Sequence, residues 1–251
     1  MKQSPCTTTI GEADGSSYYD LVVVVPVYNE QDSIRTVLEE WDRALERLGI
    51  RFCIFVYNDG SKDNSLNVLR TVASAHLGTI RIIDKKNSGH GPTILQGYRD
   101  VVSLSEWIFQ MDSDNEMGSE SFEKLWRLRN SHDFLLGTRK GRRQPFSRKV
   151  VSLVSRIVIR FFYGGRTVWD VNSPYRLMRS SAFKELFFKI PEDTFAPNLI
   201  VSGYVAQKGL RFAEIEVPHR DRQTGEVSIK KWKLFKASFR AFLQTVKFSS
   251  R

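Results

Sequence analysis

Short apolar segments alternate along the chain with longer segments in which apolar residues recur every three or four positions. The short segments are rich in β-branched residues and are followed by turn-forming residues, which is typical of strands. The longer segments have the spacing of amphipathic helices. The predicted strands are 21–27, 52–57, 80–84, 107–111 and 134–137, and the predicted helices are 32–48, 63–76, 92–102 and 119–130.

This alternation predicts an α/β fold, a Rossmann-like mixed and mainly parallel sheet flanked by helices. In such sheets, ligands bind beyond the carboxyl ends of the strands. The residues at the ends of the first four predicted strands, most of them polar or acidic, are therefore candidate site residues. They are Pro26, Tyr28, Asn29, Glu30, Asn58, Asp59, Gly60, Ser61, Lys86, Asn87, Ser88, Gly89, Asp112, Ser113, Asp114, Asn115 and Glu116.

Three acidic residues alternate with polar ones after the fourth predicted strand. An extended backbone would direct the carboxylates of Asp112, Asp114 and Glu116 to one side, where they repel one another unless a cation lies between them. Oxygen ligands of this kind suit Mg²⁺ or Mn²⁺ bound together with substrate phosphates. A solvated acidic turn, or a set of caps for the helix that follows, is the alternative.

Other metal sites fit the sequence poorly. An EF-hand would need a glycine at the sixth loop position, which this acidic segment lacks. The four histidines are scattered and none pairs with a cysteine at the spacing of a zinc site. Only His90 is kept as a candidate, because it lies in the glycine-rich loop 87–92. That loop could bind a phosphate or ribose on its backbone amides, or it is a plain turn between strand and helix.

The chain has 251 residues, 38 basic and 28 acidic, and a net charge of +10. Its two cysteines, Cys6 and Cys53, are consistent with a reduced protein that faces the cytosol and has no structural disulfide. Residues 1–20 lack the apolar region of a signal peptide, and the longest apolar run, 21–27, is far shorter than the roughly 20 residues of a membrane-spanning helix. We expect a flexible tail over 1–20, one folded α/β domain over 21–228 and a basic helix over 229–251.

Two segments carry all of the positive excess. Nine basic and no acidic residues lie between Asp133 and Asp170, seven basic and no acidic residues follow Glu226, and the remainder has a net charge of −6. Residues 148–163 and 229–251 also have amphipathic spacing, with Trp and Phe on the apolar side of the second. Helices of this kind bind anionic membrane surfaces, although they also cover a core or form the interface of a homo-oligomer. No motif that reads nucleic acid is present, so we expect no nucleic-acid partner.

Several runs, taken in order, resemble family 2 inverting glycosyltransferases of the GT-A fold, and among them the polyprenyl-phosphate (dolichyl-phosphate) sugar synthases. The resemblance covers about residues 20–230. The runs are VVVVPVYNE (22–30), YNDGSKDNS (57–65), NSGHGPTILQGY (87–98), FQMDSDNE (109–116), LLGTRKG (135–141), VWDVNSPYRLM (168–178) and AEIEVPHRDRQTGEVS (213–228).

This resemblance implies a role for each matching position. The nucleoside-diphosphate sugar would contact Pro26, Tyr28, Glu30, Asp59, Asn87, Gly89 and Asp112. A divalent cation, Mg²⁺ or Mn²⁺, would be bound by Asp112, Asp114 and Glu116. The phosphates of acceptor and donor would be bound by Arg139, Arg148, Ser152 and Arg222.

The resemblance therefore implies a metal-dependent glycosyltransferase that moves a sugar from a UDP- or GDP-linked donor to a polyprenyl phosphate, peripherally on the cytosolic face of a membrane. A lipid phosphate is already anionic and needs no general base. One alternative is a soluble family member that glycosylates a hydroxyl, with Asp170 or Asp221 as the base. Another is a non-catalytic relative whose basic helices bind membranes or nucleic acid.

Overall fold

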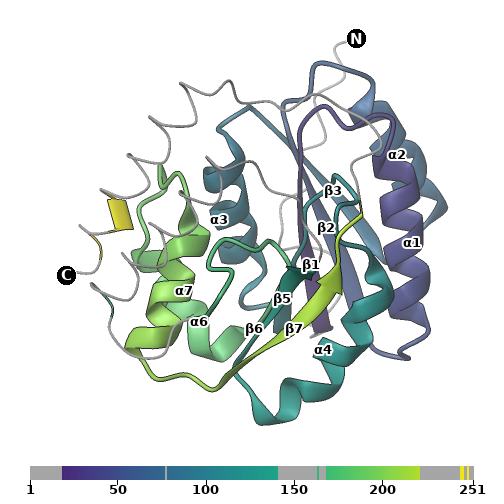
Figure 1. Cartoon of the computed structure of the whole chain (residues 1–251). Helices are drawn as coiled ribbons and strands as arrows, with labels where there is room; N and C mark the ends of the chain where they lie inside the picture. Colours follow the sequence, from purple (N-terminus) through teal and green to yellow (C-terminus); the bar gives the residue numbers. More distant parts are fainter. Residues whose placement is uncertain are drawn as a thin grey trace.

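The computed structural model describes residues 19–76, 78–140, 163, 168–220, 244–245 and 248. Within these residues one sheet has the strand order β3-β2-β1-β4-β6-β5-β7 (Figure 1). Its strands are β1 (Tyr19–Val27), β2 (Phe52–Asp59), β3 (Ile80–Lys85), β4 (Ser105–Gln110), β5 (Phe134–Lys140), β6 (Arg176–Arg179) and β7 (Phe212–Pro218).

The sheet is mainly parallel. β1 pairs in parallel with β2 and with β4, and β2 pairs in parallel with β3. β6 lies between β4 and β5 and runs antiparallel to both, while β7 is parallel to β5. The carboxyl ends of the first four strands consequently lie at one edge of the sheet, where the candidate site residues follow them.

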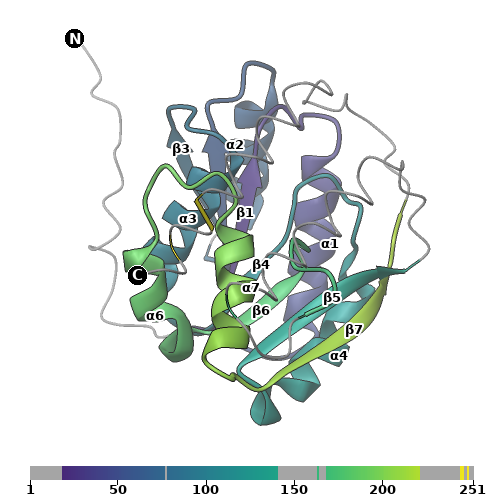
Figure 2. The same cartoon turned by 60° about the vertical axis from the view of Figure 1, so that its left-hand side comes forward.

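Helices cover both faces of the sheet (Figures 1 and 2). One core joins α1, α2 and α4 to strand residues such as Leu21 and Val23, and the other joins α3, α6 and α7 to residues such as Val22 and Val24. This division follows the alternation of side chains along a strand. The helices are α1 (Ile34–Glu46), α2 (Ser65–Ala75), α3 (His90–Val101), α4 (Phe122–Leu128), α6 (Ser180–Lys189) and α7 (Pro197–Gln207), with short 3-10 turns η1 (Ser119–Ser121) and η2 (Arg129–Ser131) flanking α4.

The predicted α/β class with a mixed, mainly parallel sheet is confirmed, as are the five predicted strands and four predicted helices. The helix predicted over 119–130 is shorter, because its two ends are 3-10 turns. The sequence did not predict β6, α6, α7 or β7. Cys53 is buried and is not in a disulfide.

Most of the predicted appendages lie outside the described residues. This applies to the tail 1–20 except for its last two residues, and to the helices predicted over 148–163 and 229–251 except for Tyr163, Gln244, Thr245 and Phe248. Among the helices that the structure describes, none has the length and apolar character needed to cross a membrane.

Candidate active site

The acidic loop, residues 111–118, begins where β4 leaves the sheet. Its first residue still donates a backbone hydrogen bond to Val24 (3.2 Å), and then the chain turns. Asn115 has a left-handed φ of +59°, and the Asp114 carboxylate accepts a hydrogen bond from the Glu116 backbone amide (3.1 Å). The extended backbone that we predicted for this segment is therefore wrong, because a compact turn replaces it.

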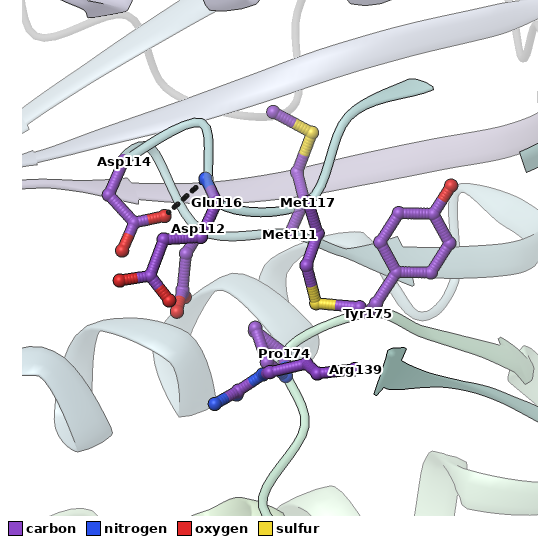
Figure 3. Close-up of a pocket in the computed structure, with 8 residues that line it drawn as sticks. All are labelled: Met111, Asp112, Asp114, Glu116, Met117, Arg139, Pro174 and Tyr175. Atoms are coloured by element: carbon purple, nitrogen blue, oxygen red, sulfur yellow. Dashed lines mark hydrogen bonds between the residues drawn. The ribbon is translucent and has the colours of Figure 1, made fainter. Parts of the chain in front are cut away.

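The turn nevertheless brings the predicted carboxylates together at one pocket. Figure 3 shows the carboxyl groups of Asp112, Asp114 and Glu116 on one side of this pocket and apolar side chains on the other. Arg139, from the end of β5, lines the same pocket. The full lining consists of Met111, Asp112, Asp114, Glu116, Met117, Arg139, Pro174 and Tyr175.

Asp112 is in an unusual environment for a carboxylate. Its Oδ1 atom is buried and has no hydrogen-bond partner among the described residues, and Nε2 of the His90 ring lies 3.7 Å from it. Burial raises the pKa of Asp112; His90 and Arg139 oppose this effect, and Asp114 and Glu116 reinforce it. A cation bound nearby would relieve this cost. Among the described residues, no group of three or more His, Cys, Asp or Glu side chains is already arranged to hold a metal ion.

Arg139 faces a carboxylate from the loop that precedes β6. Its Nε atom lies 3.8 Å from Oδ2 of Asp170, and the two side chains are only 14% and 22% exposed. The same Nε atom is buried and makes no hydrogen bond to the described residues. Asp170, which the sequence suggested only as a base for a hydroxyl acceptor, therefore lies beside the pocket.

A buried arginine fixes the loop that carries Asp170. The Arg176 guanidinium is fully buried and donates to the backbone carbonyls of Ser173, Val171 and Asn198. The Ser173 hydroxyl donates to the Gly137 carbonyl in β5 (2.6 Å). These contacts hold the loop against β5, the strand that carries Arg139, so the Arg139–Asp170 geometry is set by the core.

The loop after β1 carries the residues predicted to contact the nucleotide. Pro26 is buried in β1, whereas the Tyr28 side chain beyond it is 38% exposed. The Glu30 carboxylate accepts a hydrogen bond from Ser33 (3.0 Å), and its backbone amide donates to Ser65 at the start of α2 (2.8 Å). The loop is thus fixed at its base and presents Tyr28 to solvent.

Asp59 fastens the glycine-rich loop rather than facing solvent. Its side chain is 3% exposed, and its carboxylate accepts hydrogen bonds from Lys85 Nζ (2.5 Å) and from the amides of Ser88 (2.8 Å) and Gly89 (2.9 Å). Burial alone would raise the pKa of Asp59, but the Lys85 and backbone hydrogen bonds hold it below its usual range. Asn87 donates to the Asp59 carbonyl (2.7 Å). Asp59 therefore sets the position of Asn87 and Gly89.

The structure brings together four of the predicted site residues, Asp112, Asp114, Glu116 and Arg139, in one pocket. Pro26, Tyr28, Glu30, Asp59, Asn87 and Gly89 lie at the same edge of the sheet, at or just beyond the ends of β1, β2 and β3. Arg148, Ser152 and Arg222 lie outside the described residues. Sequence reasoning missed Met111, Met117 and Tyr175, since apolar residues beside a strand carry no signal that separates a pocket wall from a core.

The family model described as "Glycosyl transferase family 2" matches residues 22–187, which include all of the described site residues above. The chain also shares the GT-A fold of a Mycobacterium tuberculosis glucosyl-3-phosphoglycerate synthase. The structure of that enzyme in complex with Mn²⁺, UDP-glucose and glycerol 3-phosphate has a TM-score of 0.67, at 13% sequence identity, over 92% of this chain and 80% of that one.

Two curated relatives are undecaprenyl-phosphate 4-deoxy-4-formamido-L-arabinose transferases. The protein from Edwardsiella ictaluri is 28% identical over 207 residues, which cover 81% of this chain and 61% of the relative. The protein from Serratia proteamaculans is 28% identical over 215 residues, covering 84% of this chain and 63% of the relative. The chain thus spans about three-fifths of the length of these relatives. Because the family model matches well over half of its residues, the chain belongs to glycosyl transferase family 2.

Proposed function

We propose that this protein is a metal-dependent glycosyltransferase that moves a sugar from a nucleoside-diphosphate sugar to a polyprenyl phosphate. The observation that carries the proposal is the pocket in which three carboxylates from the acidic loop meet Arg139 at the carboxyl edge of the sheet. Carboxylates and an arginine are the groups needed to bind a cation and phosphates side by side. The undecaprenyl-phosphate transferases among its relatives support this choice of acceptor.

The carboxylates fit a hard divalent cation such as Mg²⁺ or Mn²⁺. The buried Asp112 Oδ1 has no hydrogen-bond partner among the described residues, and Asp114 and Glu116 supply further oxygen atoms at the same pocket. Such ions bind through one or two carboxylates plus substrate phosphates, so a complete protein cage is not required. A bound cation supplies charge stabilisation for the departing nucleoside diphosphate. The Mn²⁺ complexes of the fold neighbour agree with this assignment.

Arg139 is suited to bind a phosphate next to the cation. Its guanidinium faces Asp170, whose loop is anchored in the core, and this pairing holds it at the pocket. Its buried Nε makes no hydrogen bond to the described residues and can donate one to a phosphate. A phosphate acceptor is already ionised at neutral pH and attacks without a base, so positioning by arginine is the main requirement. We assign Arg148, Ser152 and Arg222 to the same task on the strength of the family resemblance.

The nucleotide would lie over the carboxyl ends of β1, β2 and β3. Tyr28 offers an exposed ring for the base, and Glu30 and the loop from Asn87 to Gly89 offer polar groups for the base and ribose. Asp59 would act there indirectly, because its carboxylate binds the amides of Ser88 and Gly89 and so positions this loop. The donor is UDP- or GDP-linked in this proposal, and the enzyme is peripheral on the cytosolic face of a membrane.

One observation favours a second candidate function, transfer to a hydroxyl acceptor. Asp170 lies beside the pocket with its carboxylate 3.8 Å from Arg139, where it could take the proton of a hydroxyl. The fold neighbour has been crystallised with the small phosphorylated molecules phosphoglyceric acid and glycerol 3-phosphate. This candidate predicts transfer without any lipid.

The experiment is a transfer assay with radiolabelled UDP- and GDP-sugars, Mn²⁺ and polyprenyl phosphate, followed by extraction into organic solvent. We expect label in the organic phase only when the lipid is present. Asp114→Ala should reduce this transfer at least about 100-fold, since a carboxylate at the charge-stabilising cation is removed. Glu106→Ala is the matched control, because Glu106 pairs with Arg179 at the opposite end of β4.

Other outcomes would contradict the proposal in different ways. Donor hydrolysis without a lipid product would favour the hydroxyl-acceptor candidate, and Asp170→Asn should then abolish transfer to an added alcohol. Full activity in Asp114→Ala would overturn the assignment of the cation to the acidic loop. No turnover of any donor would favour a non-catalytic relative.

A further inference from the structure

Arg220, which follows β7 after one intervening histidine, joins three separate parts of the molecule. Its guanidinium binds the Glu40 carboxylate of α1 in a bidentate manner, with Nη1–Oε2 and Nη2–Oε1 distances of 2.9 and 3.1 Å. The same guanidinium donates to Asn115 in the acidic loop (2.9 Å) and to Glu120 in η1 (2.8 Å). This set of contacts is named the Arg220 clamp.

The acidic loop is shaped to receive this guanidinium. A Cβ atom on Gly118 would lie 2.2 Å from both Cζ and Nη2 of Arg220, so a side chain at this position would displace the clamp. Beyond the glycine, the Ser119 amide and hydroxyl both donate to Oε1 of Glu40, at 2.9 and 2.8 Å. Glu40 therefore binds Ser119, the residue that follows the acidic loop, directly, and it contacts the loop itself through Arg220.

The clamp also reaches a carboxylate of the candidate site. The backbone amide of Arg220 donates to the Glu116 carbonyl (2.9 Å). This contact brings Nδ1 of the preceding residue, His219, to 3.9 Å from Oε2 of Glu116. Arg220 thus binds the backbone of Glu116, and His219 lies close to its side chain.

The clamp differs from an ordinary surface ion pair. The side chains of Arg220 and Glu40 are only 35% and 25% exposed, and four hydrogen bonds from one guanidinium satisfy three different side chains. Burial opposes ionisation of Glu40, but the bonds from Arg220 and Ser119 hold its pKa below the usual range. Bidentate arginine pairs of this kind define a geometry that single-point contacts do not.

We propose that Arg220 is a positioning residue of the candidate site. It locks the acidic loop to α1 and thereby fixes where the carboxylates of that loop meet a cation and a diphosphate. Arg220 itself is not assigned a contact with substrate. This inference rests on the proposed function for the identity of the ligands, whereas the locking of the loop can be measured without them.

The test compares Arg220→Lys with Arg211→Lys in the whole chain. Arg211 is a matched control because it precedes β7 directly, and it too forms bidentate hydrogen bonds to a carboxylate, Asp133. Three measurements are made. They are amide hydrogen exchange over residues 111–119, the affinity for Mn²⁺ in the presence of UDP or GDP by electron paramagnetic resonance, and the KM and kcat for the donor in the transfer assay.

In Arg220→Lys we expect faster exchange over 111–119 and a Kd for Mn²⁺ raised about 10- to 100-fold, the range found when residues that orient metal ligands are changed. The KM for the donor should rise more than kcat falls. Arg211→Lys should leave all of these values unchanged. Glu40→Gln keeps one oxygen acceptor for Ser119 and Arg220 but removes the charge and the second acceptor. It should raise the exchange rate and the Kd in the same direction, by less than Arg220→Lys does.

Three results would overturn the inference. The first is unchanged exchange over 111–119 in both Arg220→Lys and Glu40→Gln, and the second is faster exchange with unchanged Mn²⁺ affinity. The third is an equal effect in Arg211→Lys. If Arg220→Lys does not fold, Glu40→Gln decides alone. A wild-type protein that binds no Mn²⁺ with either nucleotide would overturn the proposed function itself, which distinguishes that failure from a failure of the clamp.

Discussion

Gly91, the second residue of α3, shows how closely the site is packed against the rest of the fold. A Cβ atom at this position would lie 2.1 Å from the carbonyl oxygen of Phe195 and 2.5 Å from that of Thr194. The backbone before α7 therefore runs directly against the start of α3. His90, the first residue of α3, faces Asp112, so this contact helps to set the helix end that borders the acidic loop.

Gly91→Ala is therefore expected to destabilise the protein. An ordinary glycine-to-alanine change within a helix stabilises it by up to about 1 kcal/mol. Here the added methyl group must displace backbone, and overpacking of this kind costs roughly 1–3 kcal/mol. Thermal unfolding measures the effect, which corresponds to a fall in Tm of several degrees for a chain of this size. A rise in Tm, as for an unconstrained helical glycine, would contradict the close approach.

The sequence predicted which residues form the candidate site better than it predicted how the backbone arranges them. Carboxylates after a strand of a parallel sheet indicated a binding edge, and the pocket at Asp112, Asp114 and Glu116 lies there. The turn at Asn115 could not be predicted, because a hydrogen bond from Arg220, 105 positions further along the chain, holds the residue with this left-handed φ. The contact of Glu40 with the acidic loop could not be predicted either, since nothing in the sequence distinguishes Glu40 from the other acidic residues of an amphipathic helix.

At the scale of elements, the sequence predicted the regular half of the sheet, β1 to β4, but in the irregular half it predicted only β5 and missed β6 and β7. The first four strands are apolar and parallel, and each precedes a helical segment, so pattern alone identifies them. β6 has only four residues and contains two arginines, one of which, Arg176, is buried because backbone carbonyls surround its guanidinium. α7 is buried around most of its circumference and therefore lacks an amphipathic period.

The irregular half is held together by Asp133, which lies just before β5. Its carboxylate accepts hydrogen bonds from Nε (3.1 Å) and Nη2 (3.0 Å) of Arg211, and it also pairs with Arg179 at the end of β6 (3.6 Å). Its backbone amide and carbonyl bond to the same two residues. One side chain thus joins the ends of three neighbouring strands, and the bonds from Arg211 lower the pKa of Asp133 below its ordinary value of 3.8.

Asp133→Asn should lower Tm at pH 7, with an effect that depends on pH. Because the folded protein lowers the pKa of Asp133, its charge contributes stability above about pH 3.8, and this contribution is lost as the pH falls through the lower folded value. The difference in Tm between the variant and the wild type should therefore narrow between pH 4 and pH 2. Glu123→Gln, which removes an exposed pair with Arg127, is the control and should change Tm little at any pH. If the difference in Tm between Asp133→Asn and the wild type stays constant as the pH falls, the charge of Asp133 is not involved.

At the scale of the whole molecule, charge is separated along the chain in a way that matches the proposed reaction. The acidic residues of the site belong to a part of the sequence with a net charge of −6, whereas all of the positive excess comes from residues between Asp133 and Asp170 and after Glu226. Most of these basic residues lie outside the described residues. A polyprenyl phosphate is presented at an anionic membrane surface, which attracts basic segments by about 1 kcal/mol per Lys or Arg.

We expect the C-terminal basic segment to attach the protein to such a surface. The double variant Phe235→Glu/Phe239→Glu places acidic groups on the apolar side predicted for 229–251, and it should reduce cosedimentation with vesicles of anionic lipid at least about tenfold. Raising the salt concentration should weaken the binding of the wild type, because ions screen the attraction. Phe188→Glu is the control, since Phe188 is an aromatic residue on α6 with 58% of its surface exposed. Undiminished sedimentation of the double variant would mean that these phenylalanines cover core or a partner subunit, and release by Phe188→Glu instead would place the membrane-binding face on α6.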